Sequence, residues 1–142
     1  MDQNQIKKLF AHKGIRSTSN RISIYEAIIQ QNNTFSLVNI EDALLHLDKS
    51  TIFRAMTLFE ENQLIHGIED GSGSKKYCLC KNKGLCQLGE NHCHFHCEVC
   101  GKTICLDDIK VPEVIIPEGF IVKKANYILK GICSDCSKKT KH

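Results

Sequence analysis

The sequence has no apolar run close to the ~18 residues that a membrane-spanning helix requires. Its first ten residues, MDQNQIKKLF, also lack the apolar core and the small-residue cleavage site of a signal peptide. Proline is scarce, and Pro112 and Pro117 bracket a short segment that is not expected to form a long helix. These absences predict a cytoplasmic protein without a membrane partner.

The net charge is also small, at +3, so the overall charge gives no sign of a nucleic-acid partner. The distribution of charge is uneven. Residues 1–21 hold five basic residues and one acid, whereas residues 22–80 hold four basic residues and eight acids. A basic end on an acidic half can meet phosphate, although a solvated helix end would have the same composition.

Cysteine, in contrast, is abundant, with nine residues. The odd number and the C-x-x-C spacing near histidines argue against a secreted disulfide scaffold and favour reduced thiols on metal. Two pairs stand out, Cys97 with Cys100 and Cys133 with Cys136. Two residues between cysteines let both thiolates face one ion, so two such pairs predict a closed tetrahedral zinc site. A thiol-redox motif is the alternative interpretation.

A second group of metal donors is less closed. His92, His94 and His96 alternate with cysteines, so on a strand the three imidazoles would share one face. A metal held by residues on both sides of a hinge would favour one arrangement of two domains, which is a mechanism for a sensor. Cys105 is expected in the core. The remaining donors of this group precede the histidines and are His66, Cys78, Cys80 and Cys86.

The first 65 residues have the periodicity of helices. One helix is predicted to end at Gly14, and a second to begin after Ser17 or Thr18. A third helix is marked by apolar residues between 40 and 47, and a fourth is capped by Asp48 or Ser50. The residues of the fourth segment that are expected to face inward are Ile52, Phe53, Met56, Phe59 and Leu64.

Two short strands follow, at residues 64–69 and 75–80, separated by the hairpin signal GSGS. Helices followed by a hairpin are the layout of a winged helix-turn-helix, or of a generic helical subdomain with a hairpin. Residues 81–91 are polar and contain glycine, so they are predicted to be a linker. Beyond it, strands are predicted at residues 92–97, 103–106 and 120–129, with a frayed Lys-rich tail.

Three motifs, in this order, make the chain similar to the ferric uptake regulator (Fur) superfamily, with a leaning to its zinc-sensing branch. Residues 14–21 (GIRSTSNR) resemble the start of its DNA-binding region, and residues 50–56 (STIFRAM) resemble its recognition helix. Residues 92–102 (HCHFHCEVCGK) resemble its metal-binding signature. The resemblance implies a metal-dependent transcriptional repressor. Such a repressor would bind a palindromic, AT-rich operator in double-stranded DNA as a homodimer.

The resemblance also implies an α+β fold in two parts. A winged helix-turn-helix DNA-binding domain would occupy residues 1–80, with the linker or hinge at 81–91. A small α/β dimerisation and metal-binding domain with a four-cysteine zinc site would occupy residues 92–142.

Carried over by position, Cys97, Cys100, Cys133 and Cys136 match the structural zinc ligands. The regulatory ligands implied by the resemblance are His66, Cys80, His92 and His94, in an arrangement that is similar to zinc-sensing members. Sulfur and imidazole suit zinc, so Zn(II) is favoured over Fe(II) as the second, regulatory divalent ion. The residues that can replace one of these ligands are Cys78, Cys86 and His96.

Three residues match positions that face DNA in the family. Phe53 stands where tyrosine is usual, so a hydroxyl is lost while contact with a thymine methyl group remains possible. Arg54 follows it on the recognition helix, and Arg16 matches a basic residue that enters the minor groove. The other DNA-binding residues implied by these motifs are Arg21, Ser50 and Thr51.

The sequence contains neither H-E-x-x-H nor a zinc-deaminase signature, so no enzyme is expected. The favoured function is a Zn(II)-responsive repressor that controls metal-uptake genes. One alternative is an iron-sensing regulator of the same family. Another, of a different class, is a thiol-redox or zinc-release protein that uses its cysteine-rich hinge.

Overall fold

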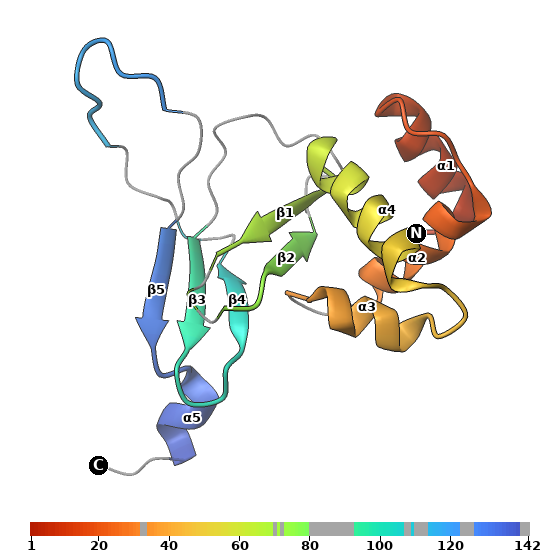
Figure 1. Cartoon of the computed structure of the whole chain (residues 1–142). Helices are drawn as coiled ribbons and strands as arrows, with labels where there is room; N and C mark the ends of the chain where they lie inside the picture. Colours follow the sequence, from red (N-terminus) through yellow and green to blue (C-terminus); the bar gives the residue numbers. More distant parts are fainter. Residues whose placement is uncertain are drawn as a thin grey trace. The chain divides into compact units, whose positions relative to one another are not determined.

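The computed structural model describes residues 1–31, 34–69, 71, 73–79, 93–106, 109, 114–122 and 127–139. The chain divides into two compact units, unit 1 (Met1–Gln87) and unit 2 (Leu88–His142), shown in Figure 1. The linker predicted at residues 81–91 lies outside the described residues. Among the helices that the structure describes, none is long and apolar enough to cross a membrane.

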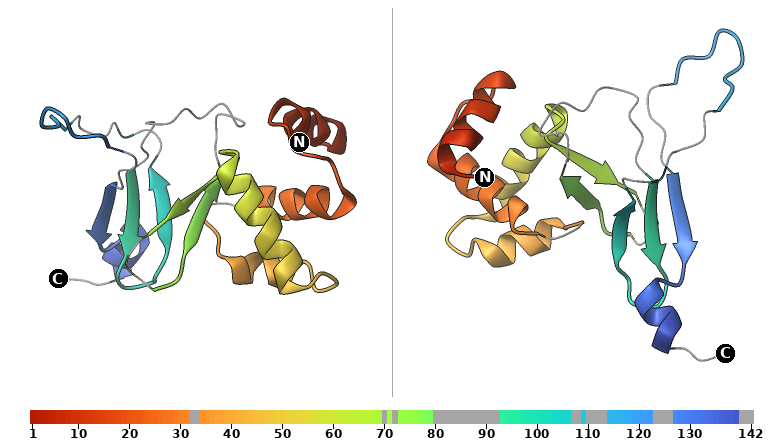
Figure 2. Two further views of the ribbon diagram at one scale, coloured as in Figure 1. Left: turned by 45° about the horizontal axis from the view of Figure 1, so that its top comes forward. Right: turned by 180° about the vertical axis from the view of Figure 1, so that it is seen from behind.

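Unit 1 contains four helices followed by a two-stranded antiparallel hairpin, in the order predicted for a winged helix-turn-helix (Figures 1 and 2). Together with the sheet of unit 2, this confirms the predicted α+β class. The elements of unit 1 are α1 (Gln3–His12), α2 (Ser19–Ile29), α3 (Leu37–Ala43), α4 (Lys49–Glu61), β1 (Ile65–Ile68) and β2 (Lys76–Leu79).

Side-chain caps set the starts of all four of these helices. Thr18 Oγ1 accepts a hydrogen bond from the Arg21 amide at 3.2 Å, and Asp48 caps α4 in the same way through the Thr51 amide. Ser36 begins α3. Each cap satisfies a backbone N–H that has no partner inside the helix. The chain leaves α1 through Gly14, whose φ of +72° is readily adopted only by glycine.

The core of unit 1 is built on three aromatic rings. The ring centroids of Phe10, Tyr25 and Phe59 lie 5.4 to 5.5 Å apart, and the side chains come from α1, α2 and α4. Burial raises the pKa of Tyr25 to about 12, so this phenol stays neutral. The isoleucines Ile6, Ile24 and Ile28 pack in the same fully buried cluster. This core holds α4 with one face toward the interior.

The hairpin is fastened to the helices at two points. Phe35, just before α3, forms a two-way backbone bridge with Tyr77 at 2.9 and 2.7 Å, and their rings stack with centroids 5.8 Å apart. Lys75 Nζ, from the residue just before β2, donates to Glu60 Oε1 of α4 at 2.9 Å. The wing and the fourth helix are therefore parts of one packed unit.

Two predictions about unit 1 are wrong. The third helix ends at Ala43 and not near residue 47, and Leu45 is 87% exposed. Phe53 does not face inward but is 51% exposed. The buried stripe of α4 follows Ile52, Ala55, Met56 and Phe59, and Phe53 is one residue, ~100° of helical rotation, away from that stripe.

Unit 2 contains a three-stranded sheet and a short helix. The strands are β3 (Cys93–Cys97), β4 (Thr103–Leu106) and β5 (Tyr127–Gly131), and β3 lies in the middle. Strand β4 pairs with β3 in antiparallel fashion, and β5 pairs with β3 in parallel. The helix α5 (Ser134–Lys139) follows β5 after two residues, and it extends into the tail from Ser137 that was predicted to be frayed.

The strand predicted at residues 120–129 begins later than expected. The amide of Phe120 donates to the carbonyl of Pro117 at 3.2 Å, and Gly119 has a φ of +85°. Proline and a positive-φ glycine at these places are typical of a reverse turn. Because the chain turns there, residues 120–122 are exposed and outside any strand, and β5 starts at Tyr127.

Candidate metal centre and nucleic-acid interface

The four cysteines of the predicted zinc site come from both ends of unit 2. Cys97 ends β3, and a tight turn with Gly101 at a φ of +78° follows it. The Gly101 amide donates to the Cys97 carbonyl at 3.0 Å, so Cys100 is folded back toward Cys97. Cys133 follows β5, and Cys136 lies in α5. The parallel pairing of β5 with β3 thus joins cysteines that are far apart in the sequence.

The geometry of this cluster suits zinc. The four sulfur atoms all lie within 4.8 Å of one another, and the Cys100 and Cys133 Sγ atoms are 3.8 Å apart. Tetrahedral zinc with Zn–S bonds of ~2.3 Å places sulfur atoms ~3.8 Å apart. Three of the four side chains are buried, and Phe95 and Ile104 pack against them. Such a closed, sulfur-only donor set is typical of a structural site.

Backbone hydrogen bonds favour the thiolate form of one cysteine in this cluster. The amides of Cys100 and Cys133 each donate to Cys97 Sγ at 3.4 Å, and these bonds lower the pKa of Cys97 to about 6. A hydrogen bond with the Cys133 side chain, followed by burial, raises the pKa of Cys136 to about 12. Four thiols this close cannot all ionise alone, and a divalent ion supplies the missing positive charge.

The structure describes part of the second predicted donor group. In unit 1, His66 of β1 lies directly across from Cys78 of β2. In unit 2, His94 and His96 lie on one face of β3, and the His96 Nδ1 atom is 3.0 Å from Thr103 Oγ1. The predicted ligands and alternates that lie outside the described residues are Cys80, Cys86 and His92.

Cys105 is expected in the core from the sequence, but the structure places it elsewhere. It is only partly buried and lies outside the cluster of Cys97, Cys133 and Cys136. In the β3–β4 register it is directly opposite His94. The alternation of polar and apolar residues along Thr103–Leu106 is the sequence signal that could have placed Cys105 on the histidine face.

The N-terminal end of α4 presents a chain of polar side chains. Ser50 Oγ donates to Asp48 Oδ2 at 3.2 Å, and Arg54 Nη2 donates to Ser50 Oγ at 3.3 Å. The Arg54 Nε atom also donates to the Ser50 carbonyl at 3.2 Å. Hydrogen bonds from Thr51 and then Ser50 hold the pKa of Asp48 below its usual value, so this carboxylate is charged at the helix start. Arg54 is therefore presented in a defined position on the surface.

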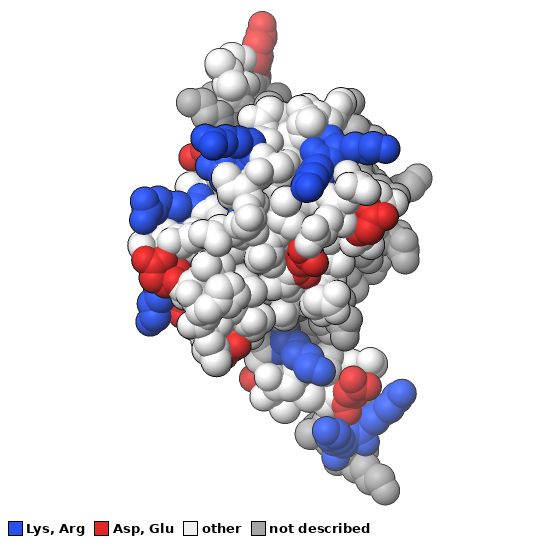
Figure 3. All heavy atoms as spheres, turned by 90° about the vertical axis from the view of Figure 1, so that its right-hand side faces the viewer, with Lys and Arg blue, Asp and Glu red and all other residues white. Residues whose placement is uncertain are grey.

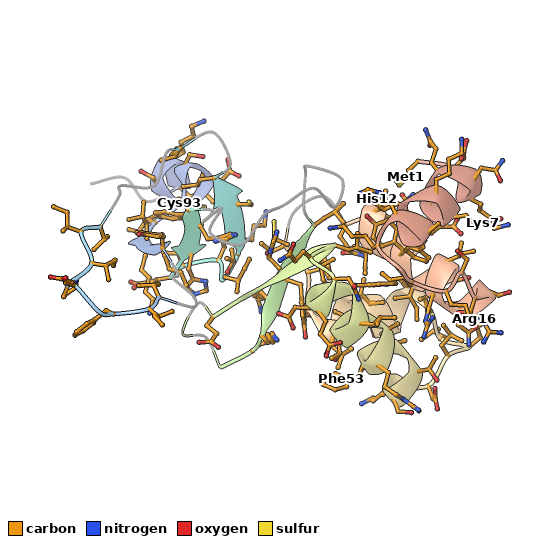
Figure 4. The ribbon with its side chains drawn as sticks, turned by 90° about the horizontal axis from the view of Figure 1, so that it is seen from above. Met1, Lys7, His12, Arg16, Phe53 and Cys93 are labelled. Atoms are coloured by element: carbon orange, nitrogen blue, oxygen red, sulfur yellow. The ribbon has the colours of Figure 1, made fainter. Side chains whose placement is uncertain are left out.

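A groove with a volume of about 510 Å³ runs between α2 and α4. Its lining includes Arg21, Thr51, Phe53 and Arg54, four of the six residues predicted to bind DNA. The fifth, Arg16, is linked to the groove because Arg21 Nη1 donates to its carbonyl at 3.0 Å. Figure 4 shows that Phe53 and Arg16 both point outward from unit 1. The structure thus gathers the side chains of Arg21, Thr51, Phe53 and Arg54 on one surface. Ser50 lies one helical turn before Arg54.

The charges on the helical face of unit 1 are mixed. In Figure 3, Lys and Arg side chains lie around the margins of this face, with Asp and Glu side chains among them. This agrees with the small net charge of the whole chain. The face can contact phosphate at several points, but it is not a uniformly basic surface of the kind that binds nucleic acid without sequence preference.

Comparison with known proteins relates both the metal centre and the helical surface to one protein family. Residues 12–138 match the model of the ferric uptake regulator family. The chain belongs to the ferric uptake regulator family. It is therefore a metal-responsive transcription regulator and not an enzyme, as the motifs predict.

Individual relatives are similar over nearly their whole length. The ferric uptake regulation protein of Campylobacter upsaliensis is 25% identical over 147 residues, with 96% of this chain and 90% of that protein covered. The peroxide operon regulator of Bacillus subtilis (strain 168) is 25% identical over 138 residues, with 91% and 89% covered. A zinc uptake regulator solved with zinc and DNA has the same fold, with a TM-score of 0.69, 20% identity and coverage of 96% and 93%.

Proposed function

We propose that this member of the ferric uptake regulator family is a Zn(II)-responsive repressor of metal-uptake genes that acts in the cytoplasm. The observation that carries the DNA-binding part is the exposed face of α4. An aromatic ring that is 51% exposed and an adjacent guanidinium project from a helix whose opposite face is fully packed. A recognition helix needs this division, because base edges must be reached from a rigid support.

The proposed target is a palindromic, AT-rich operator in double-stranded DNA, bound by a homodimer. Two copies of α4 related by a two-fold axis read two half-sites of opposite orientation, which makes the operator palindromic. Arg16 is proposed to enter an adjacent minor groove, which is narrow and strongly negative in AT-rich DNA. The similar zinc uptake regulator was solved in a complex with DNA, which supports this mode of action.

We further propose two metal sites with different roles. Cys97, Cys100, Cys133 and Cys136 hold a structural zinc ion that stays bound. The regulatory ion is bound by His66, Cys80, His92 and His94. It acts by binding more tightly to the DNA-binding conformation than to the others, which shifts the population toward it. The residues proposed as alternate ligands are Cys78, Cys86 and His96.

Zinc is proposed as the sensed metal because the candidate regulatory donors are imidazole and thiolate. Thiolate is a soft donor and imidazole a borderline one, and both suit Zn(II), whereas Fe(II) and Mn(II) sites more often include carboxylates. Iron sensing is the second candidate, and the similarity to a ferric uptake regulation protein favours it. The two candidates differ in which free metal concentration switches DNA binding.

The proposal is tested by DNA binding at controlled free metal concentrations. Duplexes are selected from a random pool with metal-loaded protein, and the affinity for the selected duplex is measured by fluorescence anisotropy. Zn(II), anaerobic Fe(II) and a mild chelator are compared. We expect an enriched inverted repeat, tight binding with Zn(II) at the lowest free concentration, and loss of specific binding with chelator.

Two results would contradict this proposal in different ways. Binding that is unaffected by chelator would exclude metal sensing, and tighter coupling to Fe(II) than to Zn(II) would favour the iron sensor. A thiol-redox function is tested in parallel by titrating free thiols and released zinc after mild peroxide. If all thiols stay reduced while DNA binding persists, the redox function is excluded.

A further inference from the structure

A carboxylate at the start of α4 is linked to Arg54 through one serine. Asp48 Oδ2 accepts a hydrogen bond from Ser50 Oγ at 3.2 Å, and Ser50 Oγ accepts one from Arg54 Nη2 at 3.3 Å. Arg54 Nε also donates to the Ser50 carbonyl at 3.2 Å. These bonds draw the guanidinium of Arg54 back along the helix, toward Asp48 and away from a fully extended position.

The two oxygens of Asp48 have different partners. Oδ1 accepts the hydrogen bond from the Thr51 amide at 3.2 Å, which caps α4, whereas Oδ2 accepts the bond from Ser50. A helix cap needs only one acceptor. Thr18 caps α2 with its single hydroxyl oxygen. The second oxygen of Asp48 is therefore not needed to begin the helix, and its contact belongs to Ser50 and Arg54.

The charge of Asp48 also lies on the surface proposed to meet DNA. Asp48, Ser50 and Arg54 are all exposed. The one lysine of α4, Lys49, has its Nζ atom 3.9 Å from Glu41 Oε2, so it is drawn toward α3. An exposed carboxylate beside Arg54 attracts the guanidinium and repels phosphate. Acids among the basic side chains of this helical face are visible in Figure 3.

We infer that Asp48 is a positioning residue that, through Ser50, keeps Arg54 from the DNA backbone and so raises the preference for the operator over other DNA. The inference rests on the proposed function and adds a residue that reads no base. Non-specific binding comes mainly from basic side chains on phosphate, and a restrained guanidinium contributes less to it. On the operator, a bidentate contact to guanine replaces the bonds to Ser50.

The inference is tested with Asp48→Asn in the intact, Zn(II)-loaded chain. Asparagine keeps the oxygen that caps Thr51, but an NH₂ group, which only donates, replaces the oxygen that accepts from Ser50. Fluorescence anisotropy measures the affinity for the selected operator and for a scrambled duplex of equal length. The scrambled duplex should bind ~3–5-fold more tightly, the weight of one exposed charge pair, while operator affinity changes less than ~2-fold.

The salt dependence of binding identifies the new contact. If the released guanidinium of Arg54 reaches a phosphate, the affinity for the scrambled duplex should fall more steeply with salt, by ~0.9 in the log–log slope. The slope for the operator should stay as in wild type. Loss of the helix cap alone would instead weaken binding to both duplexes. Circular dichroism and urea denaturation of Asp48→Asn check that the helix is kept.

The matched control is Asp2→Asn. Asp2 caps α1 through the Gln5 amide at 2.8 Å, so this variant makes the same change at another helix start of unit 1 and removes the same charge. It should leave the ratio of the two affinities unchanged. The second control is Asp48→Asn combined with Arg54→Ala. Because Asp48 acts through Arg54, changing Asp48 should no longer tighten binding to the scrambled duplex there.

The outcomes separate this inference from the proposed function. If wild-type protein prefers the operator and Asp48→Asn keeps the same ratio of affinities, the inference is overturned and the proposed function stands. An equal rise in non-specific affinity in Asp2→Asn would assign the effect to net charge, and a full effect without Arg54 would assign it to the carboxylate alone. Either result overturns the inference. If wild-type protein prefers no duplex with any metal, the proposed function fails as well.

Discussion

Arg54 is the single side chain whose replacement tests DNA reading most directly. It is exposed, and its hydrogen bonds to Ser50 hold the guanidinium at the start of α4. We expect Arg54→Ala to weaken binding to the selected operator by about 1–3 kcal/mol, the usual value of a bidentate contact to guanine. Fluorescence anisotropy with the operator and with a scrambled duplex of equal length measures the effect.

The comparison of Arg54→Ala with Arg54→Lys separates two kinds of contact. Lysine keeps the positive charge but not the planar pair of donors, so it should restore phosphate contacts and not base reading. If Arg54→Lys binds both duplexes like wild type, Arg54 contacts phosphate and does not specify sequence.

Cys97 is the residue on which the structural site depends most. Its sulfur accepts two backbone hydrogen bonds at 3.4 Å and is fully buried. Serine is a much poorer zinc ligand, so Cys97→Ser should lower the bound zinc, measured by mass spectrometry of metal content, and make unit 2 sensitive to limited proteolysis. The control variant Cys93→Ser, on the same strand, should keep its zinc. Zinc retention in Cys97→Ser would contradict this prediction, because it would show that the remaining three cysteines suffice to bind the ion.

The features of the helices and strands that the sequence predicts best are those with a local chemical cause. Thr18 and Asp48 mark the starts of α2 and α4 because a cap bonds to an amide three residues on. The two C-x-x-C pairs are also predictable from local chemistry, because a single turn of the chain brings the two cysteines of each pair together. Cys105 could not be placed in this way, because its neighbour His94 is reached only through strand pairing. The late start of β5 depends on a turn at Pro117 that the apolar pattern hides.

The shortest helix of unit 1 gives a test of these local causes. Ser36 and Asn39 form a reciprocal capping box on α3, with hydrogen bonds of 3.3 and 2.8 Å. We expect Ser36→Ala to lower the free energy of unfolding by about 1 kcal/mol, since seven residues have few other bonds to hold the first turn. Urea denaturation followed by circular dichroism measures it. Ser36→Asp keeps an acceptor and should unfold like wild type, and equal loss in both variants would assign the effect to something other than the cap.

At the scale of the whole molecule, exposed apolar side chains are concentrated in one segment of unit 2. Within residues 114–122, Ile115 is 96% exposed, Ile121 85% and Phe120 70%. Soluble monomers rarely leave large apolar side chains together in solvent, and such groups mark interaction surfaces. The homodimer proposed for operator binding would account for this apolar segment, because a second copy of the chain would cover it.

A charge introduced into this apolar segment tests whether dimerisation and DNA binding are linked. Ile121→Lys would bury an unpaired charge in the dimer, so we expect the dimer dissociation constant to rise by more than ~10-fold. Operator affinity should fall with it, because one half-site alone is bound weakly. Light scattering coupled to size exclusion measures the first effect, and anisotropy at several protein concentrations measures the second. Val38→Lys, at a 58% exposed position on α3, is the control for adding a charge in unit 1. If Ile121→Lys remains a dimer with full operator affinity, the two copies meet through another surface, and the apolar segment must serve a different partner.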